Sequence, residues 1–206
     1  MPEAVAQVSS RCIVVAVEGL DAVGKTTIAY GLKRMLVTSS IPAIVRHAEK
    51  HYLKGAFLIA REQTDPRVRY LLQASAAILM AHEIATTPVD TVFICDRYFV
   101  SARAYYLALC GTPDLVTSCC SLLPEPDLAI LLESKTAARQ ARMIRRRIPP
   151  STRKLRTLEP EFSARILNLI LPEYPWIRLN ADKLPRPEIV ARLRDEVLRY
   201  HAAFRR

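Results

Sequence analysis

The stretch Gly19-Leu20-Asp21-Ala22-Val23-Gly24-Lys25-Thr26 decides the fold of this chain. It has the spacing of a phosphate-binding loop, in which glycines permit a tight turn, a lysine reaches the outer phosphates and a hydroxyl holds Mg²⁺. An apolar run typical of a strand, Cys12 to Val17, precedes it, and a helical pattern starts at Lys25. A strand before the loop and a helix N-terminus after it, which attracts anions, are the context that such a loop needs. The sequence therefore predicts nucleotide binding.

The composition is that of a globular protein. Of the 206 residues, 50% are hydrophobic, which is enough to bury a core between three layers. The longest apolar stretches are only as long as strands, and the N-terminal residues have neither a basic start nor an apolar centre. We therefore expect a single domain over residues 1–206, without a membrane span or a signal peptide.

Charge and cysteine content bear on partners and location. A net charge of +10 could indicate a nucleic-acid partner, but no aromatic residues are interleaved with the basic ones to stack on bases, so we do not expect one. Five cysteines without metal-ligand spacing favour the reducing cytoplasm. These cysteines are Cys12, Cys95, Cys110, Cys119 and Cys120.

Apolar runs of strand length alternate with segments of helical periodicity. The predicted strands are Cys12 to Val17, Ile41 to Val45, Thr91 to Cys95, Leu128 to Leu132 and Trp176 to Leu179. The predicted helices are Lys25 to Leu36, Val68 to Ile84, Ser101 to Cys110, Lys135 to Arg147, Glu159 to Leu171 and Pro187 to Phe204. This alternation predicts an α/β fold with a five-stranded parallel sheet flanked by helices. Together with the loop at Gly19, it indicates the three-layer P-loop NTPase fold.

An arginine-rich segment interrupts this alternation. The run Arg145 to Arg156 carries much of the local positive charge, and the pair Pro149-Pro150 ends one helix before Glu159 opens the next. We expect a mobile arginine-rich lid over approximately residues 142–158, which closes over transferring phosphates. The alternative is a solvated basic loop, or one that contacts RNA.

A second polar group follows the third predicted strand. Asp96-Arg97-Tyr98 comes directly after this strand, and Ser101 and Tyr105 follow within two helical turns. Because functional residues of parallel sheets gather at the carboxyl ends of strands, Asp96 is expected to face the Mg²⁺ held by Thr26, with Arg97 beside a second phosphate. In the alternative, Asp96 caps the next helix and Arg97 pairs with a surface acid.

Together these motifs resemble the thymidylate kinase family of nucleoside monophosphate kinases. The matching stretches are Glu18-Gly19-Leu20-Asp21 running into Gly24-Lys25-Thr26-Thr27, Asp96-Arg97-Tyr98 with Ser101, Ala104 and Tyr105, the arginine-rich segment before Glu159, and, more weakly, Arg46-His47-Ala48-Glu49-Lys50. The resemblance spans most of the chain. It implies ATP and Mg²⁺ as cofactors and a small-molecule nucleotide as the acceptor.

The resemblance also implies a role for individual residues. ATP would be bound by Gly19, Ala22, Val23, Gly24, Lys25, Thr26 and Thr27, and Mg²⁺ by Thr26 and, through water, Asp96. The catalytic residues would be Lys25, Asp21, Arg97 and a lid arginine among Arg142, Arg145, Arg146 and Arg147. The acceptor would contact Asp21, Lys50, Gln73, Arg97, Ser101 and Tyr105. Family members often form homodimers through helices that flank the sheet, and Val68 to Ile84 is the candidate here.

Two positions depart from the family pattern where the base of the acceptor would bind. The family has a phenylalanine that stacks on thymine and, four residues later, an arginine that bonds its carbonyl, whereas this chain has Gln73 and Ala77. Either the helix is shifted by a turn, so that Arg61, Arg67 or Arg69 supplies the cation, or the acceptor is a different molecule. An amide offers both a donor and an acceptor, which suits a cytosine-like or modified pyrimidine as well as thymine.

The sequence thus predicts an ATP- and Mg²⁺-dependent enzyme that phosphorylates a (deoxy)nucleoside monophosphate, with dTMP as the default acceptor. A CMP- or dCMP-like nucleotide is the first alternative. A deoxynucleoside kinase is the second, although that chemistry needs a carboxylate base near the sugar, whereas Arg97 favours a phosphate acceptor. A non-catalytic P-loop protein associated with nucleic acid is the third, and the presence of Lys25, Thr26 and Asp96 argues against it.

Overall fold

A five-stranded parallel sheet forms the centre of the molecule. The computed structural model describes residues 11–60, 65–111, 122–145 and 158–204. The strands are β1 (Ile13–Gly19), β2 (Ala43–Arg46), β3 (Val92–Asp96), β4 (Leu128–Glu133) and β5 (Ile177–Asn180). Their order across the sheet is β2-β3-β1-β4-β5, and every neighbouring pair is parallel. The predicted five-stranded parallel α/β sheet is confirmed.

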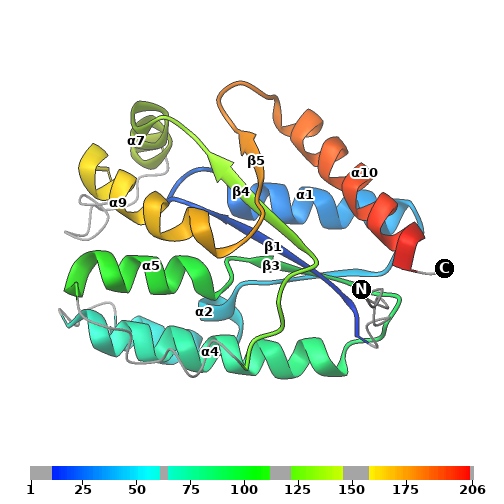
Figure 1. The fold of residues 1–206 in the computed structure, drawn as a ribbon, viewed down its shortest axis with the longest axis horizontal. Coiled ribbons are helices and arrows are strands. Elements are labelled where there is room, and N and C mark those ends of the chain that lie inside the picture. The colour runs from blue at the N-terminus through cyan, green and yellow to red at the C-terminus, as the bar shows by residue number, and fades with distance from the viewer. Residues whose placement is uncertain (1–10, 61–64, 112–121, 146–157, 205–206) are drawn as a thin grey trace, which may run out of the picture.

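Helices cover both faces of this sheet (Figure 1). On one face lie α1 (Lys25–Thr38) and α10 (Arg186–Phe204), and on the other lie α4 (Pro66–Thr86), α5 (Phe99–Cys110) and α9 (Pro160–Ile170). The shorter elements are α2 (Ala48–His51), α3 (Lys54–Ala60), α7 (Thr136–Arg145) and the 3-10 helix η1 (Leu171–Glu173). The predicted helices are found, except that the last two residues of Lys135 to Arg147 lie outside the described ranges. The elements α2 and α3 are not predicted, because segments of one or two turns show too little periodicity.

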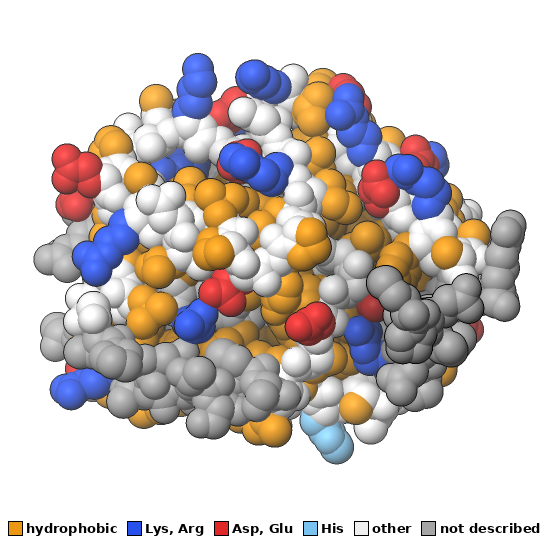
Figure 2. All heavy atoms as spheres, in the orientation of Figure 1, with side chains coloured by type: hydrophobic (Ala, Val, Ile, Leu, Met, Phe, Trp, Pro, Cys, Tyr) orange, Lys and Arg blue, Asp and Glu red, His pale blue; other side chains and the backbone are white. Residues whose placement is uncertain are grey.

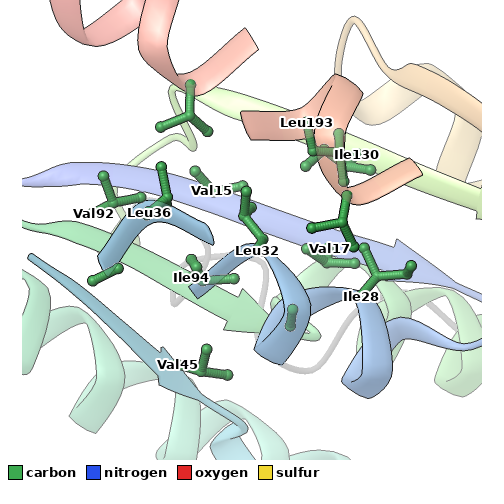
Figure 3. Close-up of a cluster of buried hydrophobic side chains, with 14 of the residues drawn as sticks. Val15, Val17, Ile28, Leu32, Leu36, Val45, Val92, Ile94, Ile130 and Leu193 are labelled. Atoms are coloured by element: carbon green, nitrogen blue, oxygen red, sulfur yellow. The ribbon is translucent and has the colours of Figure 1, made fainter. Parts of the chain in front are cut away.

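The central strand β1 is buried on both faces, because its side chains alternate between two helical layers. Val15 and Val17 face Leu32 and Leu36 of α1 (Figure 3). Val14 packs on the opposite side, in the cluster that α4 completes. A strand that is buried on both sides needs a nearly continuous apolar run, and this run is what makes the strand visible in the sequence.

The carboxyl ends of the three central strands meet at one edge of the sheet. The register pairs Val17 of β1 with Asp96 of β3, and Gly19 of β1 with Leu132 of β4. The loop after β1, the turn after β3 and the loop after β4 therefore open toward the same side. In parallel α/β proteins this is the side on which ligands bind.

The close approach of β4 leaves no room for a side chain at Gly19. Its φ is +138°, and a Cβ atom there would lie 2.4 Å from the carbonyl oxygen of Leu132, whereas at Gly24, with φ +113°, a Cβ atom would meet nothing within 4 Å. We expect Gly19→Ala to lower the free energy of unfolding by about 3 kcal/mol or more and Gly24→Ala by about 1 to 2 kcal/mol. Urea titrations of the two variants measure this difference. Equal losses would contradict the role given to the contact with β4.

The surface of the described residues bears on possible partners. Figure 2 shows one face, on which lysine and arginine side chains are scattered among acidic and apolar ones instead of forming one broad patch. Several basic side chains are paired with acids, as Arg178 is with Glu133 and Arg192 with Glu188. No helix within the described ranges is long and apolar enough to cross a membrane.

Candidate active site

The loop between β1 and α1 has the backbone geometry of an anion site. Positive φ angles occur at Gly19, at Ala22 (63°) and at Gly24 (113°). Gly24 is also the N-cap of α1, and it has no side chain that could occupy the first amides of the helix. These amides can therefore bind phosphate oxygens. The side chain of Val23 is buried in the core, so only its backbone is available to a nucleotide.

Lys25 lies within this loop, and backbone carbonyls hold its ammonium group. Its Nζ donates hydrogen bonds to the carbonyl oxygens of Gly19 at 2.8 Å and Leu20 at 2.7 Å. Burial and the positive charge of Arg97 lower the pKa of Lys25 to about 7, against the opposing attraction of Asp21. A bound phosphate would favour the charged form, so an anion and a proton are expected to bind at this lysine together.

Thr26 and Asp96 meet at the carboxyl ends of β1 and β3. The Thr26 hydroxyl donates a hydrogen bond to Oδ2 of Asp96 at 2.6 Å, and Asp96 is 1% exposed. The other carboxylate oxygen, Oδ1, is buried and has no hydrogen-bond partner among the described residues. A hydroxyl beside an under-used carboxylate oxygen fits Mg²⁺, which takes oxygen ligands from one or two protein groups, water and phosphates. Within the described ranges no cluster of three or more His, Cys, Asp and Glu side chains offers another metal site.

Arg97 connects the phosphate loop with α5. Its guanidinium donates hydrogen bonds to Oδ1 of Asp21 and, at 3.3 Å, to the hydroxyl of Ser101. Its φ is 77°, a left-handed conformation that costs a non-glycine residue free energy and is found most often at functional sites. Tyr105, one turn after Ser101, is buried and interacts electrostatically with the same guanidinium. The structure thus gathers three of the expected acceptor contacts around one cation.

A buried carboxylate links β1 to the start of α5. Oε1 of Glu18 accepts hydrogen bonds from the backbone N–H groups of Tyr98 at 2.8 Å and Ser101 at 3.3 Å. Burial raises the pKa of Glu18 despite the attraction of Arg97 and Lys25. Glu18 thereby fixes the turn that carries Arg97. The sequence motif contains Glu18 without giving it this role, and the only signal for it is an acid at the end of an apolar strand.

A pocket opens beside Arg97, between α2, α4 and α5. Its lining residues are His47, Ala48, Glu49, Gln73, Ala77, Arg97, Tyr98, Phe99, Ser101 and Ala102. The two positions that depart from the family pattern, Gln73 and Ala77, therefore both face this pocket. Arg97 lies where the pocket adjoins the phosphate loop.

The polar wall of this pocket is a hydrogen-bonded group on α2 and α4. The amide Nε2 of Gln73 donates to Oε1 of Glu49, and Arg69 binds both oxygens of the same carboxylate at 3.0 Å. Arg67 instead pairs with Asp65 at the exposed start of α4. Of the arginines considered as substitutes for the family's base-binding arginine, Arg69 is thus the one connected to the pocket wall, and position 61 lies outside the described residues.

The stretch after β2 contributes one neutral and one charged group. Burial, and to a smaller degree the charge of Lys50, lowers the pKa of His47 to about 4, so this imidazole is uncharged at neutral pH. Lys50 itself is exposed and does not line the pocket. Thr27, the last expected ATP contact, is exposed on the first turn of α1. Lys50, which the resemblance implies as an acceptor contact, is therefore not among the residues that line the pocket, and its role stays a prediction.

The predicted lid is described only at its flanks. Arg142 on α7 donates to Oδ1 of Asp182 and to the hydroxyl of Ser134, both at 2.9 Å, and so connects α7 to the loop after β5. Two other lid candidates, Arg146 and Arg147, lie outside the described residues, as does most of the segment 142–158.

A buried arginine on α7 lies near the acceptor side of the site. Arg139 is 1% exposed and donates hydrogen bonds to the hydroxyl groups of Ser163 at 2.8 Å and Thr136 at 3.2 Å. Burial lowers its pKa, and it interacts electrostatically with Tyr105 and Asp21. Arg139 therefore joins α7 to α9 beside the acceptor contacts. The sequence shows only one more arginine in a basic helix, because burial depends on the tertiary structure.

Comparison with known proteins agrees with this geometry. A family model described as Thymidylate kinase matches residues 17–186, a range that includes the phosphate loop, Asp96-Arg97 and the pocket. A stretch of 120 residues is 30% identical to "Probable thymidylate kinase 1" of Saccharolobus solfataricus. This stretch covers 58% of the present chain and 64% of that protein, so the chain spans less than two thirds of the length of the relative it matches.

Proposed function

The chain belongs to the thymidylate kinase family, and we propose that it is an enzyme that transfers the γ-phosphoryl group of ATP, with Mg²⁺, to a pyrimidine nucleoside monophosphate. The family makes dTMP the default acceptor. Residues 1–206 would form one kinase domain with a lid at about 142–158. The observation that carries the proposal is the meeting of Lys25, the Thr26–Asp96 pair and the Asp21–Arg97 pair at one edge of the sheet.

On the ATP side, the chain supplies the amides at the start of α1 and the ammonium group of Lys25. Thr26 and Asp96 would hold Mg²⁺, which, when bound, neutralises charge on the β- and γ-phosphates. Because Asp96 lies at the end of β3 and Thr26 on α1, the ion would connect the triphosphate to the strand that Arg97 directly follows.

On the acceptor side, Arg97 would bind the phosphate that attacks. This phosphate is already a nucleophile, so no general base is needed, and the protein mainly positions two phosphates and neutralises the charge between them. Asp21 and Ser101 hold the guanidinium in place, and the buried Glu18 fixes the turn behind it. Arginines of the lid would complete the site on closure and exclude water.

The proposal is tested by an ADP-release assay with ATP and Mg²⁺ against dTMP, dUMP, dCMP, CMP, UMP, dGMP and dAMP. Thymidine and deoxycytidine are added to detect a kinase that acts on a hydroxyl, and Lys25→Ala serves as the blank. We expect turnover of at least one pyrimidine monophosphate and none of the nucleosides. If no nucleotide exceeds the blank, the kinase proposal is wrong and a non-catalytic P-loop protein becomes the better interpretation.

The lowered pKa of Lys25 gives nucleotide binding a pH dependence. With a pKa of about 7, Lys25 is partly neutral in the free protein above that pH, and the triphosphate favours its charged form. ATP binding is therefore expected to take up about one proton near pH 8 and almost none near pH 6, and the affinity falls as the pH rises above 7. Calorimetry in two buffers of different ionisation enthalpy measures the uptake. Lys25→Arg, which stays charged, should abolish it; an unchanged uptake in that variant would assign the proton to another group.

A homodimer through α4 remains a prediction. One face of this helix carries Val68, Leu71, Ile78 and Leu79, whose exposed fractions are 39%, 48%, 37% and 44%. An apolar stripe of this kind on a surface helix is typical of a contact with another chain. We expect light scattering to give twice the chain mass of 23.2 kDa, and the double variant Leu71→Lys with Leu79→Lys to be monomeric. A wild-type monomer at assay concentrations would contradict this prediction.

A further inference from the structure

The pocket beside Arg97 has one end for a phosphate and one for a base. Arg97 and Ser101 lie at the end that adjoins the phosphate loop. The other end is formed by Glu49 on α2 and by Gln73 and Ala77 on α4. If the proposed function is correct, an acceptor with its phosphate on Arg97 places its base against these α2 and α4 side chains.

The base end of the pocket presents hydrogen-bond acceptors. Glu49 contributes a carboxylate, and Gln73 directs its amide nitrogen toward this carboxylate, which leaves the amide oxygen on the other side of the group. An amide oxygen can only accept, and an ionised carboxylate can only accept. A base that binds here must therefore offer a donor.

Glu49 is ion-paired with Arg69 and interacts electrostatically with Arg97. Arg69 binds Glu49 and lies 5.8 Å from the centre of the Phe57 ring, but it does not line the pocket. Among the described lining residues, the one Lys or Arg is Arg97, which Asp21 and Ser101 hold at the phosphate end. His47 is neutral at physiological pH, as its lowered pKa shows, and adds no charge.

We propose that Glu49 and Gln73 select a cytosine nucleotide as the acceptor. Cytosine carries an amino group at ring position 4, which donates hydrogen bonds, whereas thymine and uracil carry a carbonyl oxygen there. A carbonyl oxygen would face the oxygens of Glu49 and Gln73 without a proton between them. This inference rests on the proposed kinase function for the orientation of the acceptor.

The size of the pocket favours a pyrimidine over an amino-bearing purine. The cavity measures about 20 Å³, which is room for one water molecule rather than for a base. The pocket must therefore widen to admit either ring, and a pyrimidine requires the smaller widening. Adenine and guanine nucleotides are thus expected to bind more weakly than dCMP.

The test compares dCMP with dUMP, which differ only at position 4, and includes dTMP. Both kcat/KM in the ADP-release assay and the calorimetric Kd are measured, so that recognition of the base is tested even without turnover. We expect dCMP to be favoured over dUMP by about 100-fold in both quantities. In Glu49→Gln the preference should fall to about tenfold or less, because an amide can also donate.

The matched control is Glu83→Gln. Glu83 is an acid on the same helix as Gln73, but it binds Arg46 and Tyr52 and does not line the pocket. This variant should keep the wild-type preference, and a circular dichroism melt of each variant checks the fold. The wild-type ratio alone decides the question if Glu49→Gln does not fold.

The outcomes separate this inference from the kinase proposal. Turnover with dUMP or dTMP equal to or better than dCMP would overturn the cytosine inference and leave the kinase proposal standing. Tighter binding of dCMP without turnover would support the base recognition and overturn the kinase proposal. Absence of both turnover and binding preference would overturn both.

Discussion

Lys25→Ala is expected to lower the rate of phosphoryl transfer by about 10³-fold or more. In the loose transition state, the negative charge of the transferring phosphoryl group is spread over its oxygens. The carbonyl oxygens of Gly19 and Leu20 hold the ammonium group of Lys25 within the loop that would bind the phosphates of ATP. Alanine removes this charge and leaves the loop amides in place. Single-turnover measurements at saturating ATP isolate the effect on the chemical step.

The fold should tolerate this substitution. Because burial lowers the pKa of Lys25, the charged side chain is not a source of folding stability. We expect the free energy of unfolding to stay the same or to rise, because folding no longer has to bury an ammonium group. Lys33→Ala, on the same helix about two turns further on, is the matched control and should keep the wild-type rate. Full activity of Lys25→Ala would show that this loop does not act on the phosphates.

Arg97→Gln is expected to reduce kcat/KM for the acceptor by about 10³-fold while changing the Kd for ATP less than tenfold. A glutamine can still bond Ser101, but it cannot neutralise a phosphate, and it leaves the carboxylate of Asp21 facing the acceptor. The effect should therefore fall on the acceptor rather than on ATP. Steady-state kinetics with each substrate varied in turn, together with ATP binding by calorimetry, separate the two.

Arg103→Gln provides the control for Arg97. Arg103 lies on α5, the helix that follows Arg97, but it pairs with Glu173 at 2.6 Å on the surface. This variant should leave both kinetic parameters unchanged within about twofold. A rise in the KM for ATP with unaltered acceptor kinetics in Arg97→Gln would place this arginine on the ATP side and reverse the proposed orientation.

The sequence predicted only part of the acceptor pocket. Gln73 and Ala77 appear in the sequence as departures from a family pattern, which left two explanations open: a shifted helix or a different acceptor. The structure places both residues in the pocket and connects Gln73 to Glu49, 24 residues earlier in the chain. A hydrogen bond over such a separation leaves no periodicity in the sequence, so Glu49 could not be recognised as part of the pocket wall.

The environments of the lid arginines and of Lys50 could not be predicted from the sequence either. Arginine content predicts a basic segment, but it does not predict which guanidinium group forms an ion pair within the fold. Arg142 pairs with Asp182, 40 residues further along the chain, whereas Lys50 is exposed and is not among the residues that line the pocket. The roles of the arginines at 146 and 147 stay predictions.

The sequence by itself determined the phosphate loop, the strand before it and the parallel α/β sheet, because each depends on local backbone conformation or on apolar periodicity. The sequence also led us to expect Asp96 opposite Thr26, but the tertiary structure alone decided that Glu18 holds Tyr98 and that Asp21 holds Arg97. It joins Thr26 to Asp96 across 70 residues, Tyr98 to Glu18 across 80 and Arg97 to Asp21 across 76. These contacts arise because parallel strands bring their carboxyl ends to one edge of the sheet, and the order of the strands in the sheet is not written in any single segment.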